Sequence, residues 1–283
     1  MNRLCIILPA LLFLGAAAGR PDSEEREEIR KSLRFPEGSG TRQIVVDNIN
    51  GSIEVTGYDG TEIQLVAHRV SYGNSAEKLL QAKTRITLDI REEPGKVTLY
   101  VNTPWRCEEG GSYRRREDYG FDADFDFELK VPFKTDFSLR TVNKGEITVK
   151  NLEGSFEVSN VNGAIAMSGI AGDGLASTVN GEVEVSFTRV PGSRCGFRTV
   201  NGSIEVGFPS GLSADLNMKT FNGEVYSDFD VTGVPRTPLA PEKIGRRTLY
   251  RGNEFFTVRA GKGGPEMFFE TLNGDIRILQ AHQ

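Results

Sequence analysis

The sequence predicts an all-β protein whose chain winds as a β-solenoid, similar to a single-stranded β-helix, with coils of 18–21 residues and irregular caps. The first observation is a repeated motif: "TVNGSIEV" begins at Thr199, and related segments begin at Asn48, Thr178, Thr220 and Thr271. The second is a regular spacing of glycines, and the third is the alternation of apolar and polar residues between them. Repeats at a fixed period are the signature of solenoid proteins.

The spacing of the motif glycines gives the length of one coil. These glycines follow one another at steps of 18, 18, 21 and 21 residues, at Gly145, Gly163, Gly181, Gly202 and Gly223. Further glycines lie between them, for example Gly154 and Gly172. Each coil therefore has two corners, one at Asn-Gly and one at a variable residue followed by glycine.

The segments between the corners have the pattern of short β-strands. In "GEVEV", Val183 and Val185 fall on one face and the glutamates on the other. A strand of this length spans only about 15 Å and cannot bury its apolar face alone. Stacking one coil on the next would bury these faces in a continuous core.

An antiparallel sandwich or barrel is the alternative, because Asn-Gly between alternating strands is a strong hairpin signal. A meander of hairpins, however, has no reason to alternate two kinds of corner so regularly. The solenoid is therefore preferred.

Stacked corners would place equivalent side chains above one another. We expect an amide ladder, of the kind that supports parallel in-register strands, formed by Asn143, Asn162, Asn180, Asn201 and Asn222. A second ladder would follow one step earlier, from Thr141, Thr178, Thr199 and Thr220. The glycine after each Asn is expected to adopt a backbone conformation that a Cβ would forbid.

The repeats, together with "ELKVPFKTDFSLRTVNKGEITV" from Glu128, resemble the bacterial putative-adhesin family. The similarity extends over roughly residues 42–278. It implies an exported domain of unknown function built as a β-solenoid, and it carries over no active-site residues.

The ends of the chain predict its domain organisation. Residues 1–18 have one Arg, an apolar run and small residues, which indicates a cleaved signal peptide. Residues 19–40 form a charged lead-in, expected to be flexible or a short helix, and residues 41–283 form the solenoid domain, with regular coils at about 127–231. Residues 74–85 predict one helix, residues 86–101 a hairpin, and residues 234–265 with the N-terminal section the caps.

Composition limits the compartment and the partners. The formal charge is −5, or −6 without Arg3, which argues against a nucleic-acid partner. The mature chain would be periplasmic or secreted, with no transmembrane segment. Cys107 and Cys195 remain after cleavage, and an exported protein could join them as one disulfide.

Catalysis has little support in the sequence. A nucleophile-histidine arrangement would need His68 or His282, and His68 is expected on a strand surface. The acids at Asp122, Asp124 and Asp126 lack the glycine and distal glutamate of a helix-loop-helix calcium site. We therefore expect no catalytic residue, no metal and no cofactor.

The predicted function is that of a non-catalytic cell-envelope protein, an adhesin-like binding or scaffold domain. Its partner would be an envelope protein or a polysaccharide, and its open ends would permit end-to-end self-association. Glu182, Glu205 and Glu224 are a candidate partner-facing acidic stripe. The alternative is a carbohydrate-active enzyme on a β-helix.

Overall fold

The computed structural model of the protein describes residues 23–37, 40–106, 119–234, 242–244, 247–249 and 255–281. For residues 242–244 and 247–249 it describes the backbone only. Regular structure in these ranges is β apart from one helix, α1 (Ala76–Arg85), so the predicted all-β class is confirmed. The predicted signal peptide lies outside the described residues.

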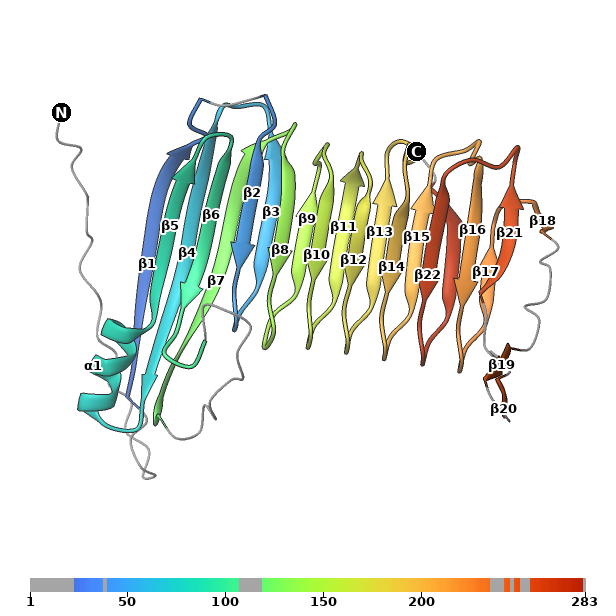
Figure 1. Cartoon of the computed structure of the whole chain (residues 1–283). Coiled ribbons are helices and arrows are strands. Elements are labelled where there is room, and N and C mark those ends of the chain that lie inside the picture. The colour runs from blue at the N-terminus through green and yellow to red at the C-terminus, as the bar shows by residue number, and fades with distance from the viewer. Residues whose placement is uncertain are drawn as a thin grey trace.

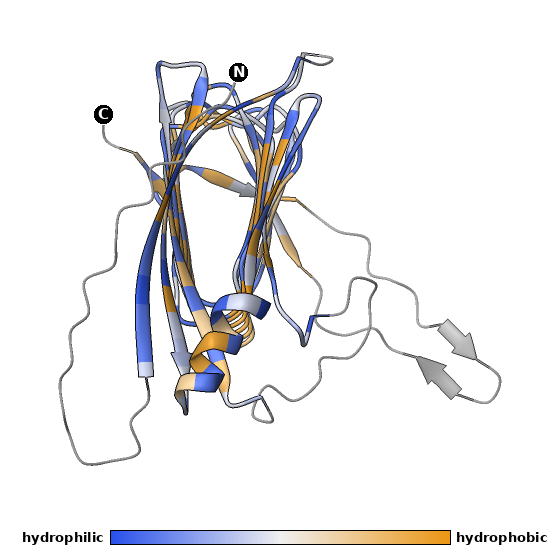
Figure 2. Ribbon diagram, turned by 90° about the vertical axis from the view of Figure 1, so that its left-hand side faces the viewer, coloured by the Kyte–Doolittle hydropathy of each residue, from blue (hydrophilic) through white to orange (hydrophobic). Residues whose placement is uncertain are grey.

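Two long mixed sheets face each other as in a β-sandwich, with the apolar side chains between them (Figures 1 and 2). Sheet A has ten strands, in the order β1 (Ser23–Arg34), β4 (Glu62–Gly73), β7 (Phe121–Pro132), β3 (Ile53–Tyr58), β9 (Ile147–Lys150), β11 (Ile165–Ile170), β13 (Val183–Phe187), β15 (Ile204–Phe208), β23 (Ile276–Gln280) and β17 (Val225–Ser227).

Sheet B has eleven strands, in the order β18 (Val231–Gly233), β21 (Phe256–Ala260), β16 (Ala214–Lys219), β22 (Glu266–Glu270), β14 (Cys195–Arg198), β12 (Gly174–Ser177), β10 (Phe156–Ser159), β8 (Asp136–Arg140), β2 (Gln43–Asp47), β6 (Lys96–Asn102) and β5 (Thr87–Glu93). A separate pair joins β19 (Glu242–Ile244) to β20 (Arg247–Leu249).

The repeated motif builds one structural unit: a strand of sheet B, an Asn-Gly turn and a strand of sheet A. The β12–β13 unit is an example, since β12 pairs in parallel with β10 and β14 while β13 pairs in parallel with β11 and β15. The Asn-Gly turn therefore joins strands of different sheets and does not close a hairpin.

The spatial order of the units departs from their order in the sequence. The β22–β23 unit, which is last in the chain, lies between β14–β15 and β16–β17. The seven units thus follow the order β2–β3, β8–β9, β10–β11, β12–β13, β14–β15, β22–β23 and β16–β17. The sequential stacking assumed from the motif is wrong at this end.

Aromatic rings fill the space between the sheets. Phe187 in β13 stacks on Phe208 of β15 with ring centroids 5.3 Å apart, and it also contacts Phe156 and Phe197 from sheet B. Phe197 stacks in turn on Phe269 at 5.3 Å. Because these contacts cross from unit to unit and from sheet to sheet, they bind the repeats into one continuous core.

The glycines of the Asn-Gly turns are required by close approach of neighbouring units. A Cβ on Gly202 would lie 2.0 Å from the carbonyl oxygen of Gly181, and one on Gly223 would lie 1.9 Å from that of Gly274. Gly145, Gly163, Gly181 and Gly223 do not have a positive φ. The expectation that each glycine adopts a conformation forbidden to other residues is therefore wrong for these four.

Each predicted ladder threonine contacts the backbone of the neighbouring unit. Thr199 Oγ1 donates to the Gly181 carbonyl at 2.8 Å, and Thr141, Thr178, Thr220 and Thr271 make equivalent bonds to Gly51, Gly163, Gly274 and Gly202. In the β10–β11 unit the amide of Asn160 takes this role, donating to Gly145. The hydroxyls therefore bind glycine carbonyls and not one another.

Replacing Thr199 with valine tests these bonds. The substitution keeps the shape but leaves the partly buried Gly181 carbonyl without its donor, which costs about 1 kcal/mol. Urea unfolding should show this loss, whereas Thr148→Val, at a half-buried β9 position, should change stability by less than about 0.5 kcal/mol. Equal effects of the two would contradict the assignment.

The charged segment after the predicted signal peptide forms a strand. Residues 23–34, expected to be flexible or helical, pair along their whole length with β4 in antiparallel register as β1. β4 would otherwise be the outermost strand, with unpaired backbone groups. Hydrogen bonding to these backbone groups outweighs the helix propensity of residues 23–34, a charged segment in which only Leu33 is buried.

Helix α1 closes the same end of the molecule and confirms the predicted helix. The buried Arg69 donates from Nη2 to the carbonyls of Ala82 and Ile86, each at 3.0 Å, and so holds the C-terminal end of the helix. Ala82 is buried, whereas Leu80 is 60% exposed, so only part of the apolar side of the helix faces the core. The hairpin predicted at residues 86–101 is present as β5–β6.

Candidate functional site

A ladder of asparagine side chains runs along one long edge of the molecule. Each Nδ2 donates to Oδ1 of the asparagine in the neighbouring unit, at 2.7–3.3 Å, through Asn143→Asn50, Asn162→Asn143, Asn180→Asn162, Asn201→Asn180, Asn273→Asn201 and Asn222→Asn273. The structure thus brings the five predicted asparagines into one row and adds Asn50 and Asn273. Asn273 separates Asn201 from Asn222, because the β22–β23 unit is inserted there.

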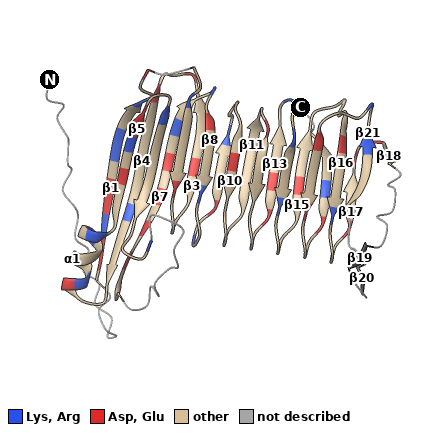
Figure 3. Ribbon diagram, in the orientation of Figure 1, with Lys and Arg blue, Asp and Glu red and all other residues tan. Residues whose placement is uncertain are grey.

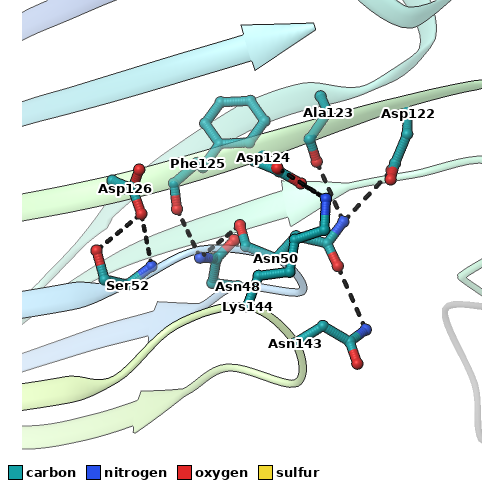
Figure 4. Close-up of polar contacts among 10 residues, drawn as sticks. All are labelled: Asn48, Asn50, Ser52, Asp122, Ala123, Asp124, Phe125, Asp126, Asn143 and Lys144. Atoms are coloured by element: carbon teal, nitrogen blue, oxygen red, sulfur yellow. Dashed lines mark hydrogen bonds and ion pairs between the residues drawn. The ribbon is translucent and has the colours of Figure 1, made fainter. Parts of the chain in front are cut away.

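All six bonds of the ladder point the same way, and the first asparagine is capped by strand β7. Asn50 is buried and donates to Asp122 Oδ1 at 3.3 Å and to the carbonyl of Ala123 at 3.2 Å (Figure 4). The amide dipoles therefore present their donor ends toward a carboxylate, which is the favourable orientation.

The neighbouring acids of β7 have equally local partners. Asp126 accepts from the backbone nitrogen and the hydroxyl of Ser52, both at 2.7 Å, and Asp124 pairs with Lys144 (Figure 4). Asp122, Asp124 and Asp126 thus fasten β7 to the first two units. Sequence reasoning considered these acids only as candidate calcium ligands and missed this role.

Beside the ladder lies a column of exposed apolar side chains, one residue before each asparagine. Val142 and Val161 are half-buried, whereas the residues nearer to β17 are exposed: Val179 (39%), Val200 (38%), Leu272 (46%) and Phe221 (65%). We call this column and the six asparagines from Asn143 to Asn222 the amide edge. In the sequence, the column is marked by an apolar residue directly before the asparagine of each corner motif, as in "VNG", "LNG" and "FNG".

The amide edge retains free hydrogen-bonding capacity. An asparagine amide has two N–H donors and two acceptor lone pairs. A ladder bond uses one donor of one residue and one acceptor of the next. The remaining groups, on exposed residues from Asn162 onward, can bind a ligand that lies along the edge.

The three glutamates of the predicted acidic stripe are not in one column. Glu205 pairs in register with Glu184 and Arg277, whereas Glu182 and Glu224 lie at the position directly after the motif glycine, level with Ser203 and Asp275. Register follows the stacked Asn-Gly turns, and Glu205 stands three residues after its motif glycine, whereas Glu182 and Glu224 stand one residue after theirs. The stripe is also interrupted, because Arg277 lies 4.0 Å from Glu205.

Cys195 lies in β14, and its side chain is fully buried in the core. Burial raises the pKa of this thiol to about 11, so the group stays neutral and unreactive at physiological pH. Cys107 lies outside the described residues, and the predicted Cys107–Cys195 disulfide remains a prediction.

The burial of Cys195 predicts its reactivity. In a Cys107→Ser variant of the mature chain, Cys195 should resist maleimide labelling at pH 7.5 in the native state and react fully in guanidinium chloride, as measured by peptide mass spectrometry. Rapid labelling of the native variant would contradict the buried position.

The remaining candidate groups are dispersed. His68 lies on β4, with its side chain 44% exposed between Glu28 and Glu128, at 3.9 and 3.5 Å; His282 lies outside the described residues. Within the described ranges, no group of three or more His, Cys, Asp or Glu side chains could hold a metal ion. The described part of the chain also contains no helix long and apolar enough to span a membrane.

Comparison with known proteins gives similarities of shape at low identity. No family model matches the chain, and no curated protein matches it. A putative cell adhesion protein from Clostridium sporogenes is similar over 92% of this chain and 100% of its own, with a TM-score of 0.40 and 11% identity.

Two further solved structures come from Parabacteroides. A putative lipid binding protein from P. distasonis has a TM-score of 0.26 and 8% identity, covering 90% of this chain and 95% of its own. A putative adhesin from P. merdae has a TM-score of 0.25 and 10% identity, covering 89% and 96%. At such values no property of these proteins transfers to this chain.

Proposed function

We propose that the protein is an exported, non-catalytic domain of the cell envelope that holds an extended polysaccharide along its amide edge, as an adhesin or a scaffold protein would. The observation that carries the proposal is the amide edge itself: exposed amides with free donors and acceptors, beside exposed aliphatic side chains, at one step per unit. Export to the periplasm or the exterior is supported by the N-terminal sequence.

We infer in addition that sheets A and B are the two faces of a β-solenoid, in which each unit is part of one coil. Support comes from parallel pairing of β9, β11, β13 and β15, with one strand of sheet B between successive members. Such winding repeats the same corner once per turn. A ligand-binding edge of this kind would therefore lengthen with each added coil.

The chemistry of the edge favours a sugar polymer over a small molecule. Neighbouring strands are about 4.8 Å apart, so the amides form an evenly spaced row. Sugar hydroxyls can both donate to and accept from such amides, while the C–H faces of the rings pack on Val200 and Leu272. An extended polysaccharide contacts several units at once, so the binding free energies of its individually weak contacts add.

Co-sedimentation of the purified protein with insoluble polysaccharide from the envelope tests the proposal. The triple variant Val179→Ser, Val200→Ser, Leu272→Ser removes apolar contacts from the edge and should weaken binding about tenfold. The control Leu80→Ser, Phe133→Ser, Leu175→Ser changes equally exposed residues elsewhere and should bind like the wild type. No binding to any polysaccharide, or equal binding of both variants, would refute it.

A further inference from the structure

Sheet A has an open strand edge at β17. β17 is the last strand of the sheet, and no other strand among the described residues pairs with its outer side. Ile276 N donates to the Glu224 carbonyl and Asp228 N to the Ile278 carbonyl, each at 2.9 Å. Since backbone groups of a strand alternate between its two sides, those of Val225 and Ser227 point outward.

This edge carries apolar and acidic side chains without a basic one. Residues 220–234 include Glu224, Asp228 and Asp230 and contain no Lys or Arg. Phe221 is 65% exposed and Tyr226 47%. The other end of sheet A differs, because β1 has four acidic and four basic residues among its twelve, a pattern that deters pairing (Figure 3).

The amide ladder is also open at this end. Every ladder oxygen from Asn50 to Asn273 accepts a bond from the next unit, but no described group donates to Asn222 Oδ1. An added strand with a side-chain amide or an ammonium group opposite Asn222 would supply that donor.

We propose that the outer edge of β17 binds an extended, lysine- or arginine-bearing peptide segment of another protein, which adds as a further strand of sheet A. The outward backbone groups of Val225 and Ser227 provide the strand pairing. Glu224, Asp228 and Asp230 select a cationic segment, and Tyr226 gives it an apolar contact. This site adjoins the last residues of the amide edge, Phe221 and Asn222.

A second copy of the chain fits this edge less well than a basic peptide. Antiparallel pairing of two β17 strands about Tyr226 would set Glu224 of one copy opposite Asp228 of the other. Like charges directly opposite each other destabilise a strand pair. The net charge of the exposed segment therefore disfavours self-association here.

Fluorescence anisotropy with a labelled peptide of alternating Lys and Val, about ten residues long, tests the proposal against its Glu/Val counterpart. The purified protein should bind the Lys peptide, and binding should weaken between about 50 mM and about 500 mM NaCl. The Glu peptide should not bind. The variant Glu224→Gln, Asp228→Asn, Asp230→Asn should lose affinity about tenfold.

Two further variants separate strand pairing from charge alone. Ser227→Pro removes an outward N–H and blocks the edge without breaking a bond to β23, so it should abolish binding. The control Glu146→Gln, Glu157→Gln, Glu184→Gln removes three exposed acids from other units and should bind like the wild type. Equal binding by the Ser227→Pro variant, or no binding up to about 1 mM peptide, would overturn the proposal.

Other occupants of the edge give different results and would also overturn it. A wild-type dimer in sedimentation velocity that Ser227→Pro dissociates would assign the edge to a second copy. Residues 235–254 contain five basic residues, Arg236, Lys243, Arg246, Arg247 and Arg251. If the peptide binds only after these are changed to Gln, the chain itself occupies the edge.

Discussion

Replacing Phe187 with alanine should lower the free energy of unfolding by about 3–5 kcal/mol. Its ring is 2% exposed and contacts Phe156 of the β10–β11 unit and Phe197 and Phe208 of the β14–β15 unit, the two units on either side of its own. Truncation opens a cavity where the two sheets meet, and the rigid strands on both sides limit its collapse. Equilibrium unfolding in urea measures the effect.

Phe133→Ala is the matched control for this prediction. Phe133 is 44% exposed, so the same truncation should cost less than about 1 kcal/mol. Comparable losses for Phe133→Ala and Phe187→Ala would mean that the aromatic contacts between units do not support the core.

A single added methyl group should be almost as damaging at Gly202. The new Cβ of a Gly202→Ala variant would lie 2.0 Å from the Gly181 carbonyl oxygen, a backbone atom that cannot rotate away. The β14–β15 and β12–β13 units must then separate locally, which also lengthens the ladder bond between Asn201 and Asn180. We expect a loss of about 3 kcal/mol, the upper end of the range for overpacking.

Gly192→Ala provides the comparison for Gly202→Ala. A Cβ at Gly192 meets no atom within 4 Å, so that variant should unfold at nearly the wild-type urea concentration. If Gly202→Ala is as stable as Gly192→Ala, close packing of the Asn-Gly turns is not what requires glycine there.

The repeating part of the fold was predictable because local and long-range signals agree. In "TVNGEVEV", alternation sets the buried face, the glycine permits close approach of the preceding unit, and Thr178 and Asn180 each donate a hydrogen bond to that unit. The same reasoning gave the amide ladder and the core-facing valines.

The parts that sequence reasoning missed depend on pairing choices between distant segments. β1 is a strand because β4 offers it an edge, which no property of "SEEREEIRKSLR" reveals. The position of β22–β23 depends on which of two similar units, "TFNGEVYS" or "TLNGDIRI", packs better on β15. The apolar column was overlooked because valines in a strand-rich sequence are ordinarily counted as core.

The insertion of the last unit has a consequence for how the chain reaches its native state. β16–β17 is synthesised well before β22–β23, yet it finds its permanent neighbour only when residues 266–280 have emerged. Until then no later unit pairs with β14–β15. The β16–β17 unit has the same Asn-Gly turn and can pair with β14–β15 first. We expect a slow final folding phase, limited by release of this premature pairing, that a chain ending before residue 266 does not show.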